Sequence, residues 1–101
     1  MSVISQVFSV DSYQVFNFEP YSILIINQGG VFYAIENNCP HENQPLAGGD
    51  VEGDEITCPI HGAVFCIKTG AVTRPPAYSK IKTYPIRVYN KKIQVDLTLP
   101  T

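Results

Sequence analysis

The feature that most constrains this chain is a pair of short loops in which a cysteine, a proline and a histidine lie close together. The first loop is Cys39-Pro40-His41 and the second is Cys58-Pro59-Ile60-His61-Gly62. The sequence has no other histidine, and two of its three cysteines stand in these loops. A histidine within three positions of a cysteine, found twice and each time in a turn that contains proline, is typical of metal ligands. We therefore predict four metal ligands: Cys39, His41, Cys58 and His61.

The residue types at this predicted site suit two kinds of metal centre. Two thiolates and two imidazoles are compatible with tetrahedral zinc and with iron–sulfur chemistry. A zinc site usually takes its sulfur ligands from one knuckle, whereas here each loop supplies one cysteine and one histidine. Two matching loops favour a binuclear centre, in which one iron takes both sulfurs, the other takes both nitrogens, and sulfides bridge them. The alternative is a structural zinc module, which would be colourless and redox-silent.

The remaining sequence is typical of an all-β protein. No segment has the sustained i, i+3, i+4, i+7 apolar spacing of an amphipathic helix, so we expect at most a turn or two of helix. Short β-branched and aromatic runs recur between turn signals, which predicts antiparallel strands. These strands are expected at 3–10, 22–27, 31–36, 55–57, 63–67, 84–89 and 93–97. Cys66 alternates with Phe65 and Ile67 in this pattern, and we predict a buried, inert thiol.

Residues 37–54 interrupt this pattern with a polar, glycine-containing stretch. A stretch of this length without regular structure is uncommon in a compact domain unless it is functional, disordered or clamped. Potential ligands at both ends favour a clamp formed by the metal. We predict a single domain over residues 1–101, in which antiparallel strands form a base and two loops form a small lobe over about 37–69. A chain of this size buries roughly 60–70% of its unfolded surface, enough for one core.

Composition and charge exclude several classes of function. The longest apolar run, Ile23-Leu24-Ile25-Ile26, is far shorter than the ~20 residues of a membrane span. The net charge of −2 and the absence of a basic cluster interleaved with aromatic residues argue against nucleic acid as a partner. Residues 1–10 do not resemble a signal peptide, and three cysteines fit ligands in a reducing compartment, so we predict a cytoplasmic protein. No nucleophile stands beside a base, so we do not expect an enzyme.

The ligand spacing resembles that of the Rieske [2Fe–2S] family. Cys-x-His is followed by sixteen residues, 42–57, and then by Cys-x-x-His. Leu46 stands where this family has an apolar lid over its cluster, and Gly62 follows the second histidine as it usually does there. Further similarity at 65–70, 75–77 and 84–88 points to the small Rieske ferredoxins of bacterial aromatic-ring dioxygenases. The resemblance covers about residues 31–97.

This resemblance implies an all-β Rieske fold that holds one [2Fe–2S] cluster. It places Cys39 and Cys58 on the inner iron, and His41 and His61 on the outer iron near the surface. It also implies a one-electron carrier, expected to be a monomer, that links an NAD(P)H-dependent flavoprotein ferredoxin reductase to a terminal oxygenase. The alternative within the family is the small Rieske-like subunit of a nitrite reductase.

The same comparison with the family predicts a low reduction potential. High-potential respiratory Rieske proteins have hydroxyl donors where this chain has Ala63 and Phe65. Fewer donors stabilise the reduced cluster less, so we expect a potential near the low end of the range of about −150 to +300 mV. Glu42 and Ile60 occupy the positions of the disulfide that links the two loops in those proteins, so no such bridge forms here.

Overall fold

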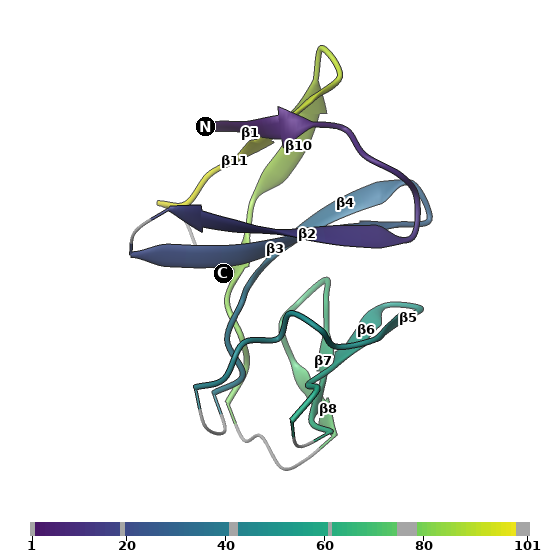
Figure 1. The fold of residues 1–101 in the computed structure, drawn as a ribbon, viewed down its shortest axis with the longest axis vertical. Helices are drawn as coiled ribbons and strands as arrows, with labels where there is room; N and C mark the ends of the chain where they lie inside the picture. Colours follow the sequence, from purple (N-terminus) through teal and green to yellow (C-terminus); the bar gives the residue numbers. More distant parts are fainter. Residues whose placement is uncertain (1, 19, 41–42, 61, 75–78, 99–101) are drawn as a thin grey trace.

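The computed structural model describes residues 2–18, 20–40, 43–60, 62–74 and 79–98. Within these residues the chain forms strands and no helix, which confirms the all-β prediction (Figure 1). The same residues therefore contain no helix of the length and hydropathy needed to cross a membrane. The strands are β1 (Ser2–Gln6), β2 (Ser12–Phe18), β3 (Tyr21–Gln28), β4 (Val31–Glu36), β5 (Val51–Glu52), β6 (Glu55–Thr57), β7 (Val64–Cys66), β8 (Val72–Arg74), β9 (Thr83–Tyr84), β10 (Ile86–Tyr89) and β11 (Lys92–Val95).

The strands pair into three antiparallel sheets. The outer sheet has the order β1-β11-β10, the central sheet β2-β3-β4-β9, and the lobe sheet β5-β6-β7-β8. Figure 1 shows the central sheet between the other two, with the lobe sheet at the opposite end from the outer sheet. The lobe sheet reaches Arg74, so the lobe extends past its predicted end near residue 69.

Strand β3 explains why the central sheet lies in the middle. Its run Ile23–Ile26 is at most 1% exposed. Ile23 and Ile25 join one core with β11, while Leu24 and Ile26 join a second core with β6 and β7. Because successive side chains of a strand point to opposite faces, a strand that is apolar on both faces fits between two layers.

Two-residue turns set the register of the hairpins beside this strand. Gly29 and Gly30 have φ angles of 63° and 93° between β3 and β4, and Asn90 and Lys91 have 52° and 61° between β10 and β11. Two successive positive φ angles are the backbone of the tight hairpin turn that matches the twist of paired strands. The glycine turn was predicted from the sequence, and β4 and β6 have the predicted bounds.

Other strands differ from the sequence prediction. The strand expected at 84–89 is divided at Pro85 into β9 and β10, which belong to different sheets. Proline lacks an N–H group for the ladder and disfavours continuous pairing there. The strand expected at 3–10 ends at Gln6. Strands β2, β5 and β8 were not predicted.

Candidate metal centre

The two cysteines predicted as ligands lie in the core between the lobe and the central sheet. Cys39 is 1% exposed and Cys58 is 2% exposed, and both belong to the buried cluster that contains Leu46 and Phe65. All three cysteines are described, and none of them forms a disulfide. The structure therefore brings the two predicted sulfur ligands into one apolar core.

The predicted nitrogen ligands, His41 and His61, lie outside the described residues. Glu42 and the proline segment 75–77 also lie outside them. Among the residues that are described, no group of three or more His, Cys, Asp and Glu side chains comes together as a metal site. The histidine half of the ligand set thus stays a prediction.

Both ligand loops are built on the same backbone turn. The N–H of Cys39 donates to the carbonyl of Gln44 at 2.7 Å, and the N–H of Asn43 donates back to the Cys39 carbonyl at 2.8 Å. In the second loop, the N–H of Cys58 donates to Ala63 at 2.7 Å, and that of Gly62 donates back to Cys58 at 3.1 Å. The two loops therefore present their cysteines in matching turns.

Each of these turns closes through a residue in the left-handed region. Asn43 has a φ of 55° and Gly62 a φ of 75°. Asparagine and glycine are the residues that adopt this conformation most readily, so the sequence places suitable residues at the same position of both turns.

The stretch of chain that follows the first ligand loop meets the residue before Cys58 at Gly49. The N–H of Gly49 donates to the Leu46 carbonyl at 3.0 Å, and the N–H of Thr57 donates to the Asp50 carbonyl at 2.9 Å. A Cβ atom on Gly49 would lie 2.0 Å from the carbonyl oxygen of Thr57, the residue before Cys58. Only glycine permits this approach, which joins the end of the first loop to the start of the second.

Two side chains that the sequence analysis did not single out tie the first loop to the central sheet. The Asn37 side chain donates to the Ser22 hydroxyl at 3.1 Å and accepts from the N–H of Ala47 at 2.9 Å. Tyr13 of β2 bonds to the backbone of Gly48 and Gly49. An asparagine ahead of a loop is a common local signal for such a bond, whereas no sequence signal marks Tyr13.

Cys66 differs from the prediction of a buried thiol. Its side chain is only half-buried, at the end of β7. Burial raises the pKa of the Cys66 thiol, but hydrogen bonds from the Thr69 side chain and from the backbone of Thr69 and Lys68 outweigh it. The net result is a pKa of Cys66 below the ordinary cysteine value.

The described part of the centre fits an iron–sulfur group. Buried thiols are soft ligands, suited to iron–sulfur clusters, whereas hard cations require a shell of oxygen atoms. Among the described residues, no aspartate or glutamate side chain is buried. Its neighbours include Ala63 and Phe65, both 0% exposed, and neither of them carries a hydroxyl.

Comparison with known proteins gives one consistent family. The family model described as "Rieske [2Fe-2S] domain" matches residues 3–85. The 3-phenylpropionate/cinnamic acid dioxygenase ferredoxin subunit of Shigella boydii serotype 4 is 42% identical over 76 residues, which cover 74% of this chain and 72% of that protein. The protein of the same name from Escherichia coli strain K12 is also 42% identical over 76 residues.

Solved structures agree with this match. The ferredoxin of carbazole 1,9a-dioxygenase from Nocardioides aromaticivorans IC177 has a TM-score of 0.86 and 26% identity, and covers 93% of this chain and 94% of its own. The ferredoxin of Sphingomonas yanoikuyae B1 has a TM-score of 0.84 and 31% identity, with 94% of this chain and 96% of its own covered. The predicted fold is confirmed.

Proposed function

Because this chain belongs to the Rieske [2Fe–2S] family, we propose that it is a ferredoxin that carries single electrons from a flavoprotein reductase to a terminal aromatic-ring oxygenase. It holds one Rieske-type cluster, as its family does. The observation that carries the proposal is the pair of buried cysteines, Cys39 and Cys58, in matching turns of one core. The names of the relatives, which are ferredoxin subunits of dioxygenases, support the oxygenase as the electron acceptor.

The ligand set of this proposal has two halves. Cys39 and Cys58 would hold one iron of the cluster, and His41 and His61, which follow them in the same two loops, would hold the other. When bound, the cluster supplies a one-electron couple whose potential the two neutral imidazoles raise relative to an all-cysteine cluster. Leu46, Ala63 and Phe65 exclude water from the cysteine side, since each is 0% exposed.

The same residues support a low potential for this couple. Donor hydrogen bonds to cluster and cysteine sulfur stabilise the reduced state. Ala63 and Phe65 offer no side-chain donor, although both lie in the core with Cys39 and Cys58. A low potential suits a carrier that a reduced flavoprotein supplies with electrons.

The tip of the second loop is where we propose that electrons leave. Ile60, which precedes His61, is 54% exposed. An exposed apolar side chain beside a ligand gives a partner a contact that excludes water over a small area, as in weak and transient electron-transfer complexes. We further propose that the carrier works as a monomer in the cytoplasm.

Metal analysis of the anaerobically purified protein tests this function. We expect about two iron and two acid-labile sulfide per chain, visible absorption, and an electron paramagnetic resonance (EPR) spectrum on reduction. Cys39→Ser should abolish cluster assembly because a hydroxyl does not replace a thiolate ligand, whereas the matched control Cys66→Ser should keep it. Stoichiometric zinc without iron or sulfide would overturn the proposal.

The partners need a separate experiment. The loaded protein is mixed with a flavoprotein ferredoxin reductase, NADH and an aromatic-ring dioxygenase. We expect the cluster to be reduced by the flavoprotein and to be reoxidised when the oxygenase and its substrate are added. A cluster that the flavoprotein cannot reduce would contradict the proposed electron donor.

A further inference from the structure

We propose that Tyr13 is a positioning residue for the cluster, because its hydroxyl fixes the junction between the two ligand loops. The inference rests on the proposed function, since that function identifies what the loops hold. Tyr13 lies on β2 of the central sheet, outside the ligand loops and the lobe.

The Tyr13 hydroxyl uses both of its hydrogen-bonding capacities on one short segment. It donates to the carbonyl of Gly49 at 2.9 Å and accepts from the N–H of Gly48 at 2.8 Å. The partners are 36 and 35 positions away along the chain, so these bonds are tertiary contacts. A hydroxyl bonded in two directions holds the Gly48–Gly49 segment more firmly than one bond would.

This segment is the one that meets the second ligand loop. Gly49 approaches the Thr57 carbonyl so closely that a Cβ atom would lie 2.0 Å from its oxygen. Thr57 immediately precedes Cys58, and Leu46, whose carbonyl accepts from the N–H of Gly49, shares the core of both cysteines. Tyr13 therefore holds one side of the junction while the second loop forms the other.

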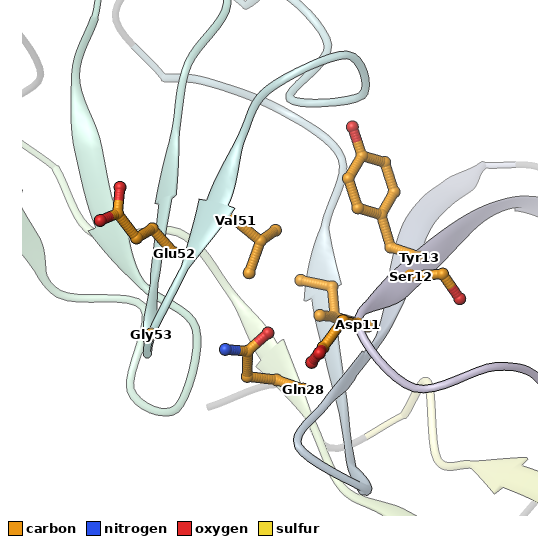
Figure 2. Close-up of a pocket in the computed structure, with 8 residues that line it drawn as sticks. Asp11, Ser12, Tyr13, Gln28, Val51, Glu52 and Gly53 are labelled. Carbon is orange, nitrogen blue, oxygen red and sulfur yellow. The ribbon is translucent and has the colours of Figure 1, made fainter.

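A cavity lies beside Tyr13, next to the segment that its hydroxyl holds. This cavity of about 330 Å³ lies between the central sheet and the β5–β6 hairpin, with Tyr13 in its wall. Asp11 and Gln28 line the cavity from one side, and Val51 and Gly53 from the other. Figure 2 shows the Tyr13 ring rising from β2, with its hydroxyl pointing away from Asp11 and Gln28. The cavity therefore separates this part of the hairpin from the sheet, whereas the Gly48–Gly49 segment ahead of the hairpin is bonded to the sheet through Tyr13.

Fixing this junction affects electron transfer because it fixes the orientation of the peptide groups in the two loops. A centre that gains and loses one electron is stabilised by dipoles already oriented in the protein, and holding them in place reduces rearrangement during the transfer. If the Gly48–Gly49 segment is released, the peptide groups of both loops become less strictly oriented. We expect a lower reduction potential, broader EPR lines and faster loss of the cluster.

The test compares Tyr13→Phe with Tyr33→Phe in the loaded protein. Tyr33 also packs against the core of Cys39 and Cys58, and its hydroxyl has no hydrogen bond to any other described residue. Each substitution removes one oxygen atom and keeps the ring. Redox titration, EPR spectroscopy and the rate of cluster release are measured. Tyr13→Phe should lower the potential, broaden the EPR lines and release the cluster about 10-fold faster, whereas Tyr33→Phe should match the wild type.

Two results would overturn the inference. One is a Tyr13→Phe protein whose potential and EPR spectrum equal those of the wild type. If Tyr13→Phe does not retain a cluster, 3-fluorotyrosine is placed at position 13, which keeps the ring and both hydrogen-bonding capacities of the hydroxyl and should therefore retain the cluster. Loss of the cluster in that protein as well is the second. A wild type without a cluster would instead refute the proposed function, so the two failures are distinguishable.

Discussion

Replacing Gly49 by alanine should separate the two ligand loops. The added Cβ would lie 2.0 Å from the Thr57 carbonyl oxygen, and real Cβ contacts are essentially never under 3.0 Å, so the two atoms must move apart before the alanine fits. Such overpacking costs about 3 kcal/mol, at the upper end of the usual range because the obstructing atom is backbone. In a domain of this size, that lowers the unfolding midpoint by about 12–24 °C.

Gly53→Ala is the matched control for this variant. A Cβ on Gly53 meets nothing within 4 Å, and its φ of 60° leaves only the conformational cost of alanine, about 1 kcal/mol. Thermal unfolding of the loaded proteins is followed by circular dichroism and by visible absorption of the cluster. We expect Gly49→Ala to lose its cluster and its fold at a temperature well below the unfolding midpoint of Gly53→Ala. Equal midpoints for the two variants would refute the steric reasoning.

The remaining predictions concern the surroundings of the cluster. Ala63→Ser adds a donor beside Cys58 and should raise the reduction potential by about 40–60 mV in a redox titration, whereas no change or a fall would contradict this. Cys66→Ser should retain wild-type iron and sulfide by elemental analysis, and loss of iron would make Cys66 a ligand. Thr69→Val removes a hydrogen bond that lowers the pKa of Cys66, so that pKa should rise and alkylation at neutral pH should slow. An unchanged pH profile of alkylation would show that Thr69 does not act on the thiol.

Strands with a simple pattern were predictable from the sequence. The central strand β3 is an unbroken apolar run, and β4 is bounded by a two-glycine turn. These signals are local because each depends on residues that adjoin in the chain. The prediction of Cys39 and Cys58 as ligands is local in the same way, since each stands near a histidine and a proline, and the structure shows both of them buried in one core.

Strand β2 lacks such a pattern because it contributes to two cores. Tyr13 packs against the core shared with the lobe, whereas Phe16 packs against the core shared with the outer sheet. Exposed residues lie between them, so the apolar positions do not alternate with period two. Strands β5 and β8 span two and three residues, too short for any periodicity. The hydrogen bonds of the Tyr13 hydroxyl could not be predicted for a related reason, since they join residues 35 or more positions apart.

Cys66 shows why turn geometry alone does not identify a ligand. Its N–H donates to the Ala71 carbonyl and the N–H of Gly70 donates back to Cys66, both at 2.8 Å, in the same arrangement as at Cys39 and Cys58. Gly70 also has a positive φ of 79°. All three cysteines of the chain therefore begin the same turn, yet only two are almost fully buried and followed by histidine. Burial does not identify a ligand by itself either, because a buried thiol can remain neutral and inert. The histidine that follows Cys39 and Cys58 distinguishes them from Cys66, whose half-buried thiol is hydrogen-bonded to Thr69.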